Sequence, residues 1–82
     1  MNKEMESQFL HIIRRWAEAI ANIERSGPEE VKLWIGINSG IERAVFELSL
    51  CGFDGFGFDD FKAVRDAANR MAREMLDGGH HE

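Results

Sequence analysis

The chain has 82 residues, enough for one small domain. Acidic residues number 15 and basic residues 10, giving a formal net charge of −5, and 44% of the residues are hydrophobic. This composition is typical of a globular protein, and the acidic surplus argues against general nucleic-acid binding, which depends on many cationic contacts with phosphate. The single cysteine excludes an internal disulfide framework and a cysteine-based zinc site. No apolar run approaches the ~18 residues that cross a membrane and no signal-peptide pattern is present, so we expect a cytoplasmic protein.

The first predicted element is a helix over about residues 3–25. Its apolar positions recur at alternating spacings of four and three, which places their side chains on one stripe of a helix. These positions are Met5, Phe9, Ile12, Trp16, Ala19 and Ile23. Alternation at a period of two fails throughout, which excludes a strand.

The second predicted helix covers about residues 28–51. Gly27 relaxes the backbone after the first helix, Pro28 suits a first helical turn, and Gly52 is the expected C-terminal cap. Apolar residues occur around most of the circumference of this helix, and such a helix is usually surrounded by protein. Only two other helices are available in one copy of the chain. We therefore predict a homodimer with the second helix near the two-fold axis.

Small residues on the second helix predict a helix-packing surface. Gly36, Gly40 and Ala44 follow one another at four-residue intervals, with Trp34 nearby. A glycine inside a helix costs about 1 kcal/mol relative to alanine, and close approach of another backbone is a common compensation. Three occupants remain open: another helix of the same chain, a second copy, or a helix of a different protein.

A glycine-rich segment over residues 51–58 separates the second helix from a third over about residues 59–77, which Asp59 or Asp60 is expected to cap. Residues 80–82 form a short polar tail. The sequence thus predicts an all-α fold in which three helices pack antiparallel, up and down, within a single domain of residues 1–79. Two such domains are expected to associate into a larger bundle.

No residue pattern predicts catalysis, a metal site or a cofactor. Cys51 is expected to be a small buried core residue, because the C-terminal end of a helix disfavours a thiolate. His11 has no evident catalytic partner, and His80 and His81 lie on the tail without fixed geometry. The aspartates near the glycine-rich segment do not follow a calcium loop. We therefore expect a protein that is not an enzyme.

The glycine-rich segment carries an unusual mixture of aromatic and acidic residues. Aromatic side chains are enriched at the strongest contacts of protein interfaces. The rings either close one end of the helix bundle or anchor a partner, and both alternatives stay open. The predicted partner-binding residues are Phe53, Asp54, Phe56, Phe58, Asp59 and Asp60, and the predicted helix-helix or dimer contacts are Trp34, Gly36, Gly40 and Ala44.

These patterns predict a small acidic, non-enzymatic module that binds another protein stoichiometrically, as an adaptor, antiactivator or phage-type inhibitor does. One alternative is a structural subunit or a small transcription regulator that binds DNA through the third helix. The cations of that helix are Lys62, Arg65, Arg70 and Arg73, although neighbouring acidic residues offset them. A further alternative is a small-molecule sensor that binds between helices near Trp16 and Trp34.

Overall fold

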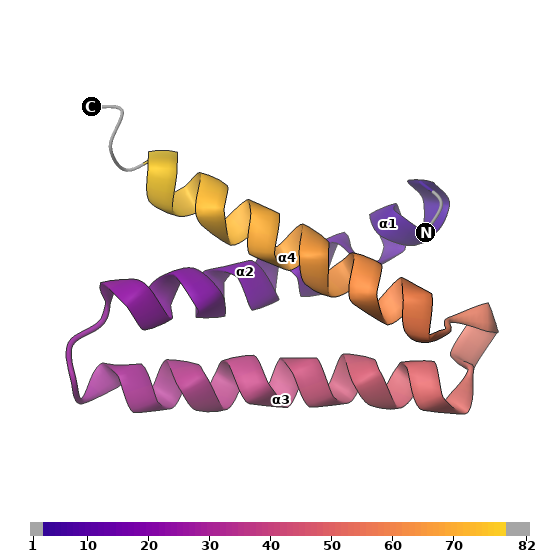
Figure 1. Ribbon diagram of the computed structural model, residues 1–82, viewed down its shortest axis with the longest axis horizontal. Helices are drawn as coiled ribbons and strands as arrows, with labels where there is room; N and C mark the ends of the chain where they lie inside the picture. Colours follow the sequence, from indigo (N-terminus) through magenta and orange to yellow (C-terminus); the bar gives the residue numbers. More distant parts are fainter. Residues whose placement is uncertain (1–2, 79–82) are drawn as a thin grey trace.

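The computed structural model describes residues 3–78, and the predicted all-α fold is confirmed. Figure 1 shows three long helices and one short one. The elements in chain order are α1 (Lys3–Gln8), α2 (Leu10–Arg25), α3 (Glu30–Cys51), the 3-10 turn η1 (Phe53–Gly55) and α4 (Phe58–Gly78).

The predicted first helix is two helices, α1 and α2, because the chain bends at Phe9. The backbone of Phe9 has φ −94° and ψ 4°, away from helical values. Its ring stacks on the buried ring of Phe56, with 4.7 Å between the centroids. We attribute the bend to this contact with a residue 47 positions away in sequence, which local periodicity does not report.

The ends of α3 follow from its flanking residues. The helix begins at Glu30, two residues after the predicted start at Pro28, and it ends at Cys51 as predicted. Gly52 then adopts a left-handed conformation with φ 65°, and its N–H donates a hydrogen bond to the carbonyl of Leu48. Glycine adopts this conformation without the steric cost of a Cβ, so the predicted C-terminal cap is confirmed.

An acidic residue caps α4, as predicted, but from inside its first turn. The helix begins at Phe58, and the carboxylate of Asp60 accepts a hydrogen bond from the N–H of Gly57 at 2.9 Å. Asp60 is the third helical residue and reaches back to the residue before the helix, which is one half of a capping box. The first-turn carboxylates of Asp59 and Asp60 also suit the positive end of the helix dipole.

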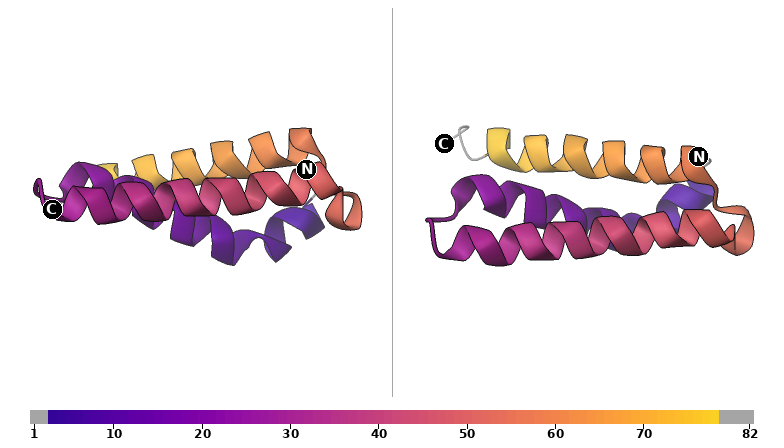
Figure 2. Two further views of the ribbon diagram at one scale, coloured as in Figure 1. Left: turned by 90° about the horizontal axis from the view of Figure 1, so that it is seen from below. Right: turned by 60° about the horizontal axis from the view of Figure 1, so that its bottom comes forward.

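The core lies along α2, which packs against both α3 and α4. Figure 1 shows α3 and α4 meeting near η1 and drawing apart toward the other end, and Figure 2 shows α2 between them there. The main core cluster consists of Ile13, Trp16, Val45, Phe56, Phe61, Val64 and Ala68. A second cluster of Ala17, Ala21 and Ala72 joins α2 to α4.

The fold is less compact than its length allows. Its Cα radius of gyration is 13.5 Å, whereas a compact domain of this length would have roughly 12 Å. The helices form a flat arrangement whose shortest dimension is 16 Å. A single copy therefore leaves much of α3 uncovered.

Candidate protein-binding surfaces

Of the three long helices, α3 is the one that the rest of the described chain covers least. Val45 is its only fully buried residue. Leu33, Ile35 and Leu50 are 60%, 48% and 64% exposed. The composition of α3 predicts that protein surrounds this helix. Within the described residues, one copy of the chain does not bury it in this way.

Two neighbouring seams of α3 repeat at the same spacing of four and three residues. The inner seam faces α2 and consists of Trp34, Asn38, Ile41, Val45 and Leu48. The outer seam consists of Leu33, Ile37, Gly40, Ala44, Glu47 and Cys51, all of which are exposed. At about 100° per residue the outer seam lies about 100° around the helix from the inner seam, beside it and turned away from the core. The outer seam carries a single charged residue, Glu47.

The glycines of α3 are open to solvent. A Cβ added at Gly36 or at Gly40 would meet no atom within 4 Å. Of the three occupants left open, another helix of the same chain is therefore excluded at Gly36 and Gly40 within the described residues, since α2 and α4 pack on other faces of α3. Trp34 is half-buried in the inner seam, whereas Ala44 is exposed.

Ala44 also borders an apolar hollow between α2 and α3. The hollow has a volume of about 170 Å³. Its lining residues are His11, Ile12, Arg15, Ile41, Ala44, Val45 and Leu48. A cavity of ~150 Å³ accommodates benzene, so this hollow has room for one aliphatic side chain.

The aromatic residues of the glycine-rich segment divide between the core and the surface. Phe56 is 1% exposed, and its ring stacks on Phe9. It therefore closes the end of the bundle and cannot contact a partner unless the core opens. Phe53 and Phe58 are 62% and 54% exposed. These two are the predicted anchors that a partner can reach.

The three aspartates near these rings differ in what they contact. Asp60 caps α4, as described above. Asp59 is almost fully exposed, with an oxygen 3.7 Å from the ammonium of Lys62. Asp54 is exposed, and its positive φ of 50° occurs in the tight turn of η1. Asp54 and Asp59 thus present carboxylates to solvent. We call Leu50, Phe53, Asp54, Phe58 and Asp59 together the aromatic end.

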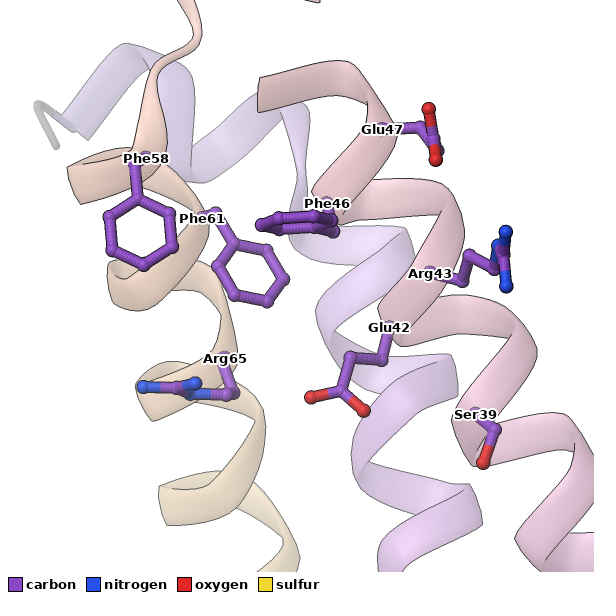
Figure 3. Close-up of a pocket in the computed structure, with 8 residues that line it drawn as sticks. All are labelled: Ser39, Glu42, Arg43, Phe46, Glu47, Phe58, Phe61 and Arg65. Atoms are coloured by element: carbon purple, nitrogen blue, oxygen red, sulfur yellow. The ribbon is translucent and has the colours of Figure 1, made fainter. Parts of the chain in front are cut away.

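A groove of about 630 Å³ runs between α3 and α4 beside the aromatic end. In Figure 3 the rings of Phe46 and Phe61 point toward each other between the two helices, with the ring of Phe58 next to Phe61, while Arg43 and Glu47 point away from the rings. The ring centroid of Phe46 lies 5.3 Å from that of Phe61 and 6.3 Å from that of Phe58. The groove offers an aromatic wall to an apolar side chain.

Two of the four cations proposed for DNA binding lie against these rings. The ammonium of Lys62 is 5.2 Å from the centroid of Phe58, and the guanidinium of Arg65 is 5.5 Å from that of Phe61. Such contacts stabilise a cation over an aromatic face. They hold both side chains close to the protein surface.

Trp16 makes a contact that sequence reasoning missed. Its indole N–H donates a hydrogen bond of 2.7 Å to the side-chain carbonyl of Asn38 on α3. Trp16 is buried, and a buried indole N–H needs an acceptor. Asn38 is the one polar residue in the otherwise apolar inner seam, and this was the only sign in the sequence of a buried hydrogen bond. That Asn38 lies next to Trp16 becomes apparent only in the folded chain.

The prediction that Cys51 is buried is wrong. The thiol is exposed and donates to the carbonyl of Leu48, with sulfur and oxygen 3.4 Å apart. Cys51 lies on the outer seam of α3, which is exposed along its length. His11 is exposed beside the apolar hollow, while His80 and His81 lie outside the described residues.

Within residues 3–78 no three His, Cys, Asp or Glu side chains gather as metal ligands would. Across the same part of the chain, none of the helices combines the length and the apolar character needed to cross a bilayer. No protein-family model, curated protein or solved structure matches the chain significantly.

Proposed function

We propose that the chain is a small non-enzymatic module that binds another protein stoichiometrically, and that the partner docks on the aromatic end. The observation that carries this proposal is the exposure of Leu50, Phe53 and Phe58 at one end of the bundle. Large apolar side chains gathered on the surface of a small protein mark interaction sites more often than chance. Aromatic side chains also lose little conformational entropy when a partner buries them.

The charge around this end favours a basic partner surface. Asp54 and Asp59 flank the exposed rings, and the whole chain carries a net charge of −5. Complementary charge accelerates association and selects against acidic partners. The groove of Phe46, Phe58 and Phe61 lies beside the same end and would receive an apolar side chain of the partner.

In this proposal the three long helices are a rigid support for the docking surface. α2, α3 and α4 run alternately up and down, and two copies associate into a larger bundle. Phe56 holds the turn of η1 against the core, so the positions of Phe53 and Phe58 are determined before a partner arrives. Preorganisation of this kind lowers the entropy cost of binding.

The test is affinity capture from the native host, followed by binding measurements with the purified partner. The informative bait carries Phe53→Ser and Phe58→Ser together, and the matched control carries Ile35→Ser, which removes an exposed apolar residue outside the aromatic end. We expect wild-type and control baits to recover the same partner and the double variant to lose it, with a binding affinity that falls as salt rises. Circular dichroism checks that all three baits are folded. Retention of the partner by the folded double variant would refute docking at the aromatic end.

A further inference from the structure

We infer that the outer seam of α3 binds the same seam of a second copy of the chain, with the two helices antiparallel. This surface shares no residue with the aromatic end, so the inference stands without the docking proposal. Leu33 and Ile37 are its two large apolar residues, 60% and 36% exposed. Within residues 3–78 all six seam residues are exposed, and a Cβ added at Gly40 would meet no atom within 4 Å.

The order of residues along the seam is self-complementary only in the antiparallel direction. Large residues occupy its first half, Leu33 and Ile37, and small residues its second half, Gly40 and Ala44. The register that sets Leu33 opposite Ala44 of the second copy also sets Ile37 opposite Gly40. Each large side chain then meets a small one, and two-fold symmetry repeats both pairs.

The hollow beside Ala44 gives the Leu33 side chain a place to insert. It is lined mainly by aliphatic residues and has a volume of about 170 Å³. In the antiparallel register Leu33 of each copy lies next to the hollow of the other. The contact therefore buries a leucine that is otherwise largely exposed, which stabilises the pair by the hydrophobic effect.

Parallel pairing lacks this fit. It would set Leu33 against Leu33 and Gly40 against Gly40. The two leucines facing each other would hold the helices apart. The two glycines facing each other would leave a void, and the atoms around it would lose packing contacts. The distribution of large and small residues therefore selects one direction.

The size of the seam predicts a weak dimer. α3 has 22 residues, hence a length of about 33 Å, and a helix is about 10–12 Å wide with its side chains. A contact of this footprint lies at the small end of specific interfaces, which bury about 800 Å² on each partner when stable. We expect dissociation in the micromolar range and a dimer that forms as concentration rises.

Glu47 makes the stability of the antiparallel dimer depend on salt concentration. The same antiparallel register brings Glu47 opposite Glu30 of the second copy, at both ends of the contact. Like charges at these positions repel, and salt screens the repulsion. We therefore expect the dimer to strengthen at higher ionic strength and in a Glu47→Gln variant, the opposite of the salt response expected for a basic partner at the aromatic end.

Sedimentation equilibrium over a range of concentrations tests the pairing. We expect the wild-type chain to approach twice its mass of 9.4 kDa. Leu33→Glu should remain monomeric at every concentration, whereas Ile35→Glu, an equally drastic change on a different face of the same helix, should dimerise like the wild type. Circular dichroism on dilute samples checks the fold of both variants. A wild-type chain that is monomeric at millimolar concentration would overturn the inference, as would dimerisation of folded Leu33→Glu.

The single cysteine reports the direction of pairing. A spin label on Cys51, which is exposed, would lie about 38 Å along the helix axis from its counterpart in the antiparallel register, at 1.5 Å per residue. In a parallel pair the two labels would be neighbours. Pulsed electron-electron distance measurements separate these cases. A short distance in the dimer, or disulfide cross-linking of two copies through Cys51, would refute the antiparallel register.

Discussion

Truncation of Phe56 to alanine should cost this protein a large part of its stability. The ring is 1% exposed, belongs to the main core cluster and stacks on Phe9 at 4.7 Å. Removal of a buried phenylalanine side chain typically costs about 3–5 kcal/mol. A chain of 82 residues has a total unfolding free energy of roughly 4–12 kcal/mol. Phe56→Ala therefore removes at least about a quarter of the unfolding free energy, and at the low end of that range it removes most or all of it.

Thermal unfolding followed by circular dichroism measures this effect. In a domain of this size 1 kcal/mol corresponds to about 4–8 °C, so the melting temperature should fall by roughly 12 °C or more. Phe53→Ala is the matched control, since it removes the same ring from a position that is 62% exposed. Its melting temperature should change little, because substitutions at exposed positions usually alter stability by no more than about 0.5 kcal/mol.

The melting temperature should fall much further in Phe56→Ala than in Phe53→Ala. Equal melting temperatures for Phe56→Ala and wild type would mean that the ring is not part of the core. A large loss in Phe53→Ala would mean that this side chain is buried in solution, for example by a second copy or by closure of the turn. Either result would refute the division of the aromatic residues between core and surface.

Three further substitutions test other parts of the fold by the same melting experiment. Gly36→Ala should raise the unfolding free energy by about 1 kcal/mol, because the helix gains an alanine and the added Cβ meets no atom within 4 Å; a loss would indicate a neighbour at this position. Asn38→Ala should cost about 1–3 kcal/mol, since the buried indole N–H of Trp16 loses its acceptor, and an unchanged melting temperature would argue against that hydrogen bond. Asp60→Ala should cost about 1 kcal/mol through loss of the bond to the N–H of Gly57, and no change would show that α4 begins without this cap.

Hydrophobic spacing predicted the helices well because it records which side chains share a face. The repeat of four and three residues located the first and third predicted helices, and the flanking Gly27, Pro28 and Gly52 located the second, each to within a few residues apart from the bend at Phe9. Gly52 and Asp60 act at helix ends through local backbone geometry and short-range hydrogen bonds. Such local interactions are readable from neighbouring residues alone.

The errors all concern contacts between residues distant in sequence. The spacing continues through Phe9, whose ring is drawn to Phe56. Cys51 was expected in the core, yet it lies on the exposed outer seam of α3. Gly36, Gly40 and Ala44 were compatible with a crossing helix of the same chain. No residue near them in sequence indicates that α2 and α4 pack on other faces of α3.

The amino-acid sequence by itself determined that this chain forms helices, where the three long helices lie to within a few residues, and that α3 is apolar around most of its circumference. It also supplied the large and small residues whose order along α3 is self-complementary. Tertiary structure alone decided which side of α3 faces α2, and therefore which seam remains exposed. It also separated Phe56 from Phe53, because burial depends on packing in three dimensions and residues three positions apart in a turn can lie on opposite sides of it.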